Sequence, residues 1–322
     1  MSGVVIKSCC APTRERAAHL AESRLISAAR PRAAAGSTEG MIKLEAGSFL
    51  MGTDSPEAFP FDGEGPVRKV SLDAFYLDVN PVTNERFNEF AQATGYKSEA
   101  ELIGWSFVFQ GHIPAEKRPA LVDRTVPGVP WWCQVWGADW RHPEGPDTTT
   151  AGRHDHPVVQ VSWNDAIEYC RWAGKRLPTE AEWECAARGG WEQKSFPWGD
   201  ELTPGGQHFC NVWQGDFPNA DLAEDGYAAT APVTAFPPNP YGFNVITGNA
   251  WEWCHDWFHN SYHAAASRSN PAGPSLGSAR VIKGGSYLCH HSYCNRYRVA
   301  ARTSNTPDSA TTHMSFRCAR DV

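Results

Sequence analysis

Hydrophobic residues recur at helical spacing in three stretches of the chain, and each stretch predicts an amphipathic helix. In the first stretch, Phe87, Phe90 and Ala91 fall on one face. Thr83 can cap the N-terminus of this helix, and Gly95 can end it.

The second and third helices carry similar start and stop signals. Ser162 can cap the second helix and Gly174 can close it. Its expected buried stripe consists of Ala166, Tyr169, Cys170 and Ala173. In the third helix, Thr179 and Glu182 form a capping box, and Gly189 stops the helix.

Outside these helices the apolar runs are short and turn residues are frequent. Two strand-like runs flank Gly47 in "MIKLEAGSFLMG", and short strands and turns fill the chain after residue 190. No segment repeats at a fixed period. These patterns predict a single α+β domain over residues 41–322, with little regular structure for its size.

Residues 1–40 are predicted to form a flexible leader. The stretch from Arg14 to Ala29 favours a helix, which "PRAAAGSTEG" then breaks. The leader lacks the apolar core of a secretory signal, so we expect a cytoplasmic protein.

Composition narrows the class of protein. The 28 Gly, 24 Pro and 14 Trp favour a loop-rich body with a core of large aromatic side chains. The net charge of -7 argues against a nucleic-acid partner, because phosphate binding needs a positive surface. No apolar run approaches the ~20 residues of a membrane span. The ten cysteines include no C-x-x-C pair, so a zinc ribbon is not expected.

One pair of cysteines is distinctive in its spacing. Cys289 and Cys294 lie five positions apart in "KGGSYLCHHSYCNRYR", with Ser286 just before them. The spacing alone leaves three interpretations open: a disulfide, two inert buried thiols, or a clamp for a soft metal such as Cu(I), which thiolates select.

The segment "NVWQGDFPNADLAEDGY" gathers oxygen donors of the kind that Ca2+ prefers. They are the side chains of Asn211 and Asp225 and the carbonyls of Val212 and Tyr227. The alternative is a surface loop with Asx-turns. In "GNAWEWCHDW", Glu252 is either a buried hydrogen-bonded carboxylate or a ligand of a second calcium ion.

A family resemblance joins these segments. The motifs "GSFLMG", "GKRLPTEAEWE", "NVWQGDFP", "GNAWEW" and "GGSYLCHHSYCNRYRVAARTSNTPDS" make residues 41–322 resemble the formylglycine-generating enzymes, or sulfatase-modifying factors. "GKRLPTEAEWE" and "GNAWEW" are shared with a wider superfamily that includes non-catalytic and iron-dependent members. The paired cysteines in "SYLCHHSYCNRYR" are specific to the generating enzymes.

The resemblance implies a variant of the C-type-lectin-like fold and a monomeric, copper-dependent oxidase. Such enzymes use O2 and a thiol reductant to convert the cysteine of a Cys-x-Pro-x-Arg segment in an unfolded sulfatase into Cα-formylglycine. It also implies that Cys289 and Cys294 bind Cu(I) and that Ser286 lies beside them. Substrate-binding positions are implied at Trp105, Trp132, Tyr293, Arg296 and His313.

Two other functions stay open within the superfamily. One is an iron-dependent enzyme that forms C–S bonds oxidatively, which would need a histidine-rich metal motif that this chain lacks. The other is a non-catalytic, lectin-like module that binds a ligand, which would have no need of the thiol pair.

The resemblance also implies structural calcium. One site is expected at Asn211, Val212, Asp225 and Tyr227, and a second at Gly248, Ala250 and Glu252. The family usually has Asn or Asp where this chain has Val245, and the nearest asparagine, Asn244, lies one place early. The second site is therefore expected to be shifted, weaker or empty.

Two departures from the family bear on substrate and redox state. Vertebrate members hold the substrate arginine with acidic residues at the positions of Pro81 and Trp105. Here we expect stacking on tryptophan, or another carboxylate, to replace them. Cys170 and Cys318 match a disulfide of secreted relatives and are expected to be reduced, and a second such pair lacks a member at Val299.

The leader contains Cys10-Ala11-Pro12-Thr13-Arg14, which matches the recognition pattern of the implied substrates. One hypothesis is that the leader occupies the peptide groove, in cis or in trans, as a pseudo-substrate or as a self-modification site at Cys10. The alternative is a coincidence in a tail.

Overall fold

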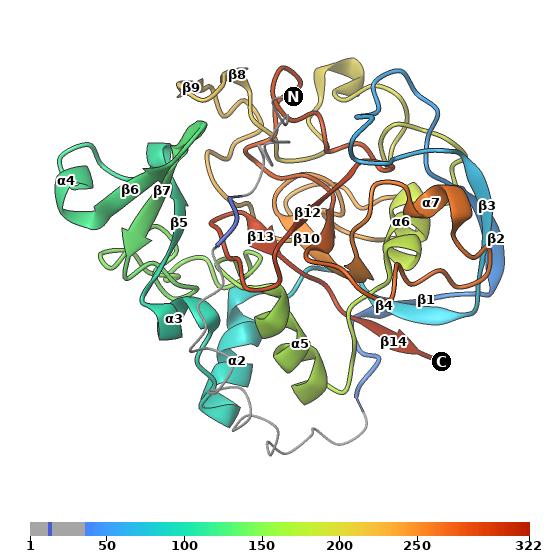
Figure 1. Ribbon diagram of the computed structural model, residues 1–322, viewed down its shortest axis with the longest axis horizontal. Coiled ribbons are helices and arrows are strands. Elements are labelled where there is room, and N and C mark those ends of the chain that lie inside the picture. The colour runs from blue at the N-terminus through green and yellow to red at the C-terminus, as the bar shows by residue number, and fades with distance from the viewer. Residues whose placement is uncertain (1–11, 15–35) are drawn as a thin grey trace, which may run out of the picture.

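The computed structural model describes residues 12–14 and 36–322 of the chain (Figure 1). Helices are few and short in this part of the chain, and the strands form several small sheets joined by long loops. The helices are α2 (Asn84–Thr94), α3 (Glu99–Ile103), α4 (Arg118–Leu121), α5 (Trp163–Trp172), α6 (Glu180–Arg188) and α7 (Tyr262–Ala265), with the 3-10 turns η2 (Gln110–His112) and η3 (Pro204–Gly206). No described helix is long and apolar enough to cross a membrane.

The three predicted helices are confirmed as α2, α5 and α6. Thr83 caps α2 by accepting from the Arg86 N–H, and Gly95 ends the helix with a left-handed φ of 66°. Both α5 and α6 begin with capping boxes. The prediction for Ala173 was wrong: α5 ends at Trp172, so Ala173 is the C-cap and lies half-buried at the edge of the core instead of in the buried stripe.

Five sheets complete the architecture. The central one has the order β12 (Arg302–Asn305), β11 (Arg280–Lys283), β10 (Trp251–Trp257), β13 (Met314–Ser315). A second has the order β1 (Met41–Leu44), β4 (Phe75–Asp78), β14 (Ala319–Asp321). A third, which stands to one side in Figure 1, has the order β5 (Trp105–Phe109), β7 (Val129–Trp136), β6 (Val122–Val126). The two-stranded sheets are β2 (Gly47–Met51) with β3 (Arg68–Leu72), and β8 (Gly215–Asp216) with β9 (Ala220–Asp221).

The predicted helix between Arg14 and Ala29 lies outside the described residues, apart from Arg14 itself. Pro12 and Arg14 are buried against the domain. The chain re-enters the described structure at Gly36, whose carbonyl accepts from Arg320, and β1 begins at Met41.

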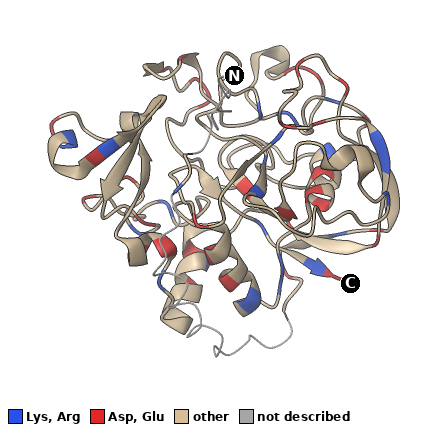
Figure 2. Ribbon diagram, viewed as in Figure 1, with Lys and Arg blue, Asp and Glu red and all other residues tan. Residues whose placement is uncertain are grey.

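Two buried cations hold the ends of the loop that contains the paired cysteines. Lys283 ends β11 and Arg302 begins β12, and the two residues face each other in the β11–β12 register. Both reach carboxylates one turn apart on α6: Lys283 Nζ lies 3.1 Å from Glu184 Oε2, and Arg302 Nε lies 2.7 Å from Glu180 Oε1. We call these four residues the α6 clamp; Figure 2 shows the acidic residues of α6 in red.

Two further ion pairs fix the middle of the same loop. Arg296 Nε lies 2.6 Å from Asp62 Oδ2, and Arg298 Nη1 lies 2.7 Å from Glu64 Oε2. All four side chains are buried. The loop between β11 and β12 is therefore held against both α6 and the segment that joins β2 to β3.

Replacing Arg302 with Met should lower the free energy of unfolding by about 3–5 kcal/mol, because the Glu180 carboxylate would stay buried without its main partner. The matched control is Arg171→Met, which removes an exposed partner of Glu168 and should cost under about 1 kcal/mol. Urea unfolding followed by tryptophan fluorescence measures both. Similar losses in the two variants would contradict the clamp.

Acid should weaken the clamp through Glu184. Burial alone would raise the pKa of this carboxyl, but Lys283, Arg188 and the Gly52 N–H together lower it from 4.5 to about 2. A lowered folded-state pKa gives stability that is present above pH 4.5 and is lost as the pH falls towards 2. The full shift corresponds to about 3 kcal/mol.

The test compares wild type with Glu184→Gln in urea between pH 6 and pH 3. The variant should be less stable at pH 6, and the gap should narrow steadily as the pH falls. A gap that is constant with pH would show that Glu184 does not titrate as described.

Candidate active site

The paired cysteines meet at the bottom of a buried loop. Gly284 and Gly285 follow β11 with φ of 91° and 73°, and a Cβ on Gly285 would lie 2.9 Å from Tyr297 Cα, so glycine is needed for this turn. Beyond it, the Sγ atoms of Cys289 and Cys294 lie 2.8 Å apart. Both side chains are almost completely buried.

The sulfur separation discriminates among the interpretations of the pair. It is longer than the ~2.05 Å bond of a disulfide. It is shorter than two metal–thiolate bonds end to end, at about 2.3 Å each. The sulfurs of Cys289 and Cys294 therefore meet without a disulfide between them, and they would have to move apart by roughly 2 Å to bind one ion in line.

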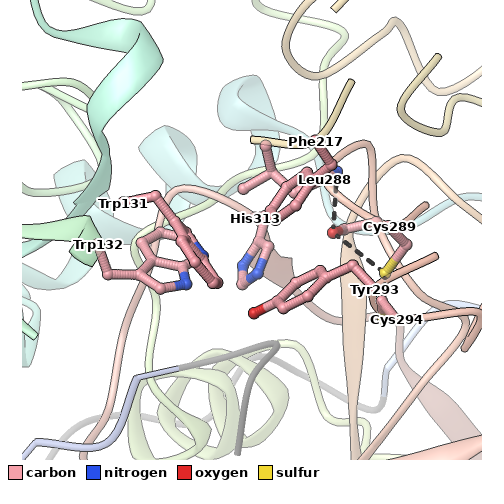
Figure 3. A pocket seen from close by; sticks show the side chains of 9 residues that line it. Trp131, Trp132, Phe217, Leu288, Cys289, Tyr293, Cys294 and His313 are labelled. Atoms are coloured by element: carbon pink, nitrogen blue, oxygen red, sulfur yellow. Dashed lines mark hydrogen bonds between the residues drawn. The ribbon is translucent and has the colours of Figure 1, made fainter. Parts of the chain in front are cut away.

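A small pocket of about 10 Å³, room for about one water molecule, lies in front of the thiols. Figure 3 shows tryptophans at one end, the two cysteines at the other, and aromatic rings between them. Its lining consists of Trp131, Trp132, Phe217, Ser286, Leu288, Cys289, Tyr293, Cys294 and His313. The Tyr293 ring stacks on Phe217 with centroids 4.3 Å apart, and the Trp132 ring meets His313 edge-on at 4.7 Å.

Most of the predicted site residues come together here. Ser286 Oγ lies 3.9 Å from Cys289 Sγ and accepts from the Leu288 N–H. His313 is held by Thr311, whose Oγ1 lies 2.6 Å from His313 Nδ1. Trp132 and Tyr293 form part of the aromatic wall.

Two predicted substrate-binding residues do not line this pocket. Arg296 pairs with Asp62 and lies 4.0 Å from the centroid of the Phe59 ring. Trp105, on β5, lies instead under the guanidinium of Arg14 from the leader. Pro81, the other position at which an acidic residue was expected to be replaced, is buried.

Sequence reasoning missed Trp131, Phe217 and Leu288 as pocket residues. The doubled tryptophan in "PWWCQ" was the available signal for Trp131. Phe217 lies on the turn between β8 and β9, far from the thiols in sequence, and no local pattern marks it.

The donor set fits a soft ion of low coordination number. Thiolates prefer Cu(I), zinc and iron–sulfur clusters, and zinc normally takes four ligands. Within residues 12–14 and 36–322, no group of three or more His, Cys, Asp or Glu side chains could hold a metal. Two converging thiols beside an apolar pocket therefore suit Cu(I) better than zinc.

Of the oxygen donors predicted for calcium, the Val212 carbonyl and Asp225 Oδ2 contact one atom, Gln214 Nε2. Asn211 is fully buried, its amide donates to Ala229 and Asn249, and its Oδ1 has no hydrogen-bond partner in the described structure. A buried acceptor without a partner is unusual and is consistent with a cation site.

Gln214 occupies the space between the other donors. Its Nε2 contacts the Val212 carbonyl closely and lies 2.8 Å from Asp225 Oδ2. Asp225 Oδ1 accepts from the Tyr227 N–H. Burial is the main cause that raises the pKa of Asp225. A cation would reverse this shift, and the Gln214 amide would have to turn away to admit it.

The second predicted calcium site has less support. Both oxygens of Glu252 are engaged, at 2.7 Å from Arg317 Nη2 and from Trp183 Nε1, which matches the buried hydrogen-bonded alternative. The Val245 side chain packs in an apolar cluster. The Asn244 amide donates to Asn80. The remaining predicted positions, Gly248 and Ala250, lie in the turn before β10.

Cys170 and Cys318 are free thiols with sulfurs 3.5 Å apart. Burial raises the pKa of Cys318 well above its ordinary value, so this residue is a protonated thiol at neutral pH.

Comparison with known proteins agrees with this geometry. Residues 27–322 match the model of the sulfatase-modifying factor enzyme 1-like domain. The chain is 58% identical to the formylglycine-generating enzyme of Thermomonospora curvata, over 88% of this chain and 94% of that one. It is 55% identical to the formylglycine-generating enzyme of Bos taurus, over 87% and 74%.

A solved structure supports the fold class. PvdO from Pseudomonas aeruginosa superposes with a TM-score of 0.64 at 27% identity, over 88% of this chain and 94% of that one. The predicted α+β, C-type-lectin-like fold of low regular structure is thereby confirmed.

Proposed function

Because this chain belongs to the formylglycine-generating enzymes, the sulfatase-modifying factor family, we propose that it is a copper-dependent oxidase. It would convert the cysteine of a Cys-x-Pro-x-Arg segment in an unfolded sulfatase into Cα-formylglycine with O2. The observation that carries the proposal is the pair of buried, converging thiols of Cys289 and Cys294.

The reaction needs an oxidant and a reductant besides the peptide. At the substrate Cβ, the C–S bond and one C–H bond are replaced by C=O, which is a two-electron oxidation. O2 accepts four electrons, so the other two come from two reductant thiols. The balance is peptidyl-CH2SH + O2 + 2 RSH giving peptidyl-CHO + H2S + RSSR + H2O.

The side chains divide this task. A cuprous ion held by Cys289 and Cys294 would supply the activation of O2 that side chains do not provide. Ser286, beside Cys289, can donate a hydrogen bond to a polar group of the reacting species. The stacked rings of Tyr293 and Phe217 keep bulk water from the thiols.

The apolar character of the pocket also suits a peptide thiol. Its lining is largely apolar, so the uncharged thiol of a peptide cysteine would lose little solvation free energy on entering. Orientation of the substrate carbon beside the oxidant is the contribution that a closed pocket of this shape can make to the rate.

We further propose calcium at the cluster of Asn211, Val212, Asp225 and Tyr227. The buried Oδ1 of Asn211 supports this assignment. The cluster lies on the chain that leads to the pocket residue Phe217, so the ion would stabilise the wall of the pocket and take no part in the chemistry.

Cys294→Ser should abolish turnover of a Cys-x-Pro-x-Arg peptide, because a hydroxyl does not replace a thiolate towards a soft ion. Aldehyde formation is measured by mass spectrometry with added Cu(I), O2 and a thiol reductant. Cys185→Ser, on α6 and outside the pocket, is the control and should keep wild-type turnover. Turnover by the Cys294 variant, or full activity of rigorously copper-free wild type, would refute the proposal.

Calcium should raise the melting temperature of wild type, since a ligand that binds only the folded state stabilises it. Asp225→Ala should remove this response. Asp200→Ala, which alters an exposed pair with Lys194, should retain it. A shift of equal size in the Asp225 variant would place the ion elsewhere.

A further inference from the structure

Three residues of the leader lie in the domain as a peptide ligand would. The Pro12 carbonyl accepts from Asn305 Nδ2 at 3.1 Å, and the Arg14 N–H donates to Ser309 Oγ at 2.7 Å. Pro12 and Arg14 are buried, whereas Thr13 between them is exposed. The fixed proline and arginine of the pattern thus face the domain, and the variable position between them faces solvent.

Arg14 occupies a site suited to a planar cation. Its guanidinium lies over the Trp105 ring, 4.6 Å from the centroid. Nη2 donates to the Trp105 carbonyl at 2.7 Å, and Nη1 donates to the Asp308 carbonyl at 3.2 Å. At a position where vertebrate members are expected to use acidic residues, this chain binds the arginine through one aromatic ring and two backbone carbonyls.

The charge of Arg14 is retained in this site. Burial lowers the pKa of its guanidinium to about 10, while Glu99, Asp165 and Asp308 act in the opposite direction. A buried cation is costly unless it is well hydrogen-bonded. Nη1 and Nη2 of Arg14 are hydrogen-bonded, while Nε has no partner in the described structure. Two directed bonds from a buried side chain point to specific recognition instead of loose contact of a tail.

Packed aromatic rings connect the site of Arg14 to the lining of the thiol pocket. The Trp105 ring meets Phe107 edge-on at 5.1 Å, and Phe107 belongs to the same apolar cluster as Trp132. Trp132 in turn contacts His313 of the pocket. Cys10 lies outside the described residues, but it precedes Pro12 by two positions, and two extended residues span about 7 Å.

We propose that the chain is its own substrate: residues 10–14 bind in cis as a Cys-x-Pro-x-Arg peptide, and Cys10 is oxidised to Cα-formylglycine. This inference rests on the proposed function and uses the same balance, with O2 as oxidant and two reductant thiols as electron donors. The Cβ of Cys10 loses its sulfur as sulfide and gains the aldehyde oxygen. Until it leaves the groove, the leader excludes sulfatase peptides.

The first test measures occupancy without copper. A fluorescent Cys-x-Pro-x-Arg peptide, with serine in place of its cysteine, is titrated into the metal-free full chain. Arg14→Ala should bind this peptide at least several-fold more tightly than wild type, because the leader no longer competes. Arg16→Ala removes the same charge two positions outside the motif and should bind as wild type does. Equal affinity in all three proteins would overturn the proposal.

The second test measures modification. Wild type is incubated with Cu(I), O2 and dithiothreitol, and its leader peptide is analysed by mass spectrometry alongside an added peptide substrate. An aldehyde at Cys10, absent from Arg14→Ala and formed at a rate independent of protein concentration, supports oxidation in cis.

The failures are distinguishable. If the added peptide is converted while Cys10 keeps its thiol, the self-modification is overturned and the proposed function stands. A rate that rises with protein concentration overturns oxidation in cis. If neither cysteine is converted, the proposed function itself fails, and the inference fails with it.

Discussion

The position of the thiol pair depends on the α6 clamp, which joins the two ends of its loop, already paired in the β11–β12 ladder, to one helix. Residues 284–301 contain no helix or strand, and local backbone hydrogen bonds such as Cys289 N–H to Ser286 and Cys294 N–H to His290 shape the loop without tying it to the sheet. Glu180 and Glu184, one turn apart on α6, bind the residues at which the loop leaves and rejoins the central sheet. Buried pairs of this kind are directional, and a metal or catalytic site needs positions correct to a fraction of an ångström.

The same constraint explains the charged core of a loop-rich protein. Where long helices and strands are scarce, distant segments must be joined by side chains. Arg298 and Arg296 join the thiol loop to the segment after β2, and Arg317 joins the chain after β13 to Glu252 on β10. Each pair loses solvation on burial. In exchange for this solvation, the directional ion pairs fix the relative positions of the loops, which an apolar contact of equal area would define less tightly.

Local features could be predicted from the sequence, and remote ones could not. The caps of α2, α5 and α6 depend on residues three or four positions apart, which the sequence displays directly. Ala173 was placed in the buried stripe wrongly, because the exact end of a helix depends on the packing of the residues that follow it. Phe217 reaches the pocket through a turn whose path depends on the whole fold, so its role had no local signal. The thiol spacing left a disulfide, inert thiols and a metal clamp open, and the aromatic rings that surround the pair could be found only from tertiary structure.

Recognition of a short peptide by its two ends has a consequence for any leader that contains the same pattern. In the proposed complex, Trp105 would receive the arginine and the thiol pocket the cysteine, and the span between them would set the sequence that fits. A tethered segment meets such a groove at an effective concentration near the millimolar range, whereas a sulfatase arrives from dilute solution. Selectivity for the pattern alone would therefore favour the leader over the sulfatase. For the enzyme to turn over, the cis complex must be weakened or its cysteine consumed, and conversion of Cys10 to an aldehyde removes the one group through which the leader could bind the thiol end.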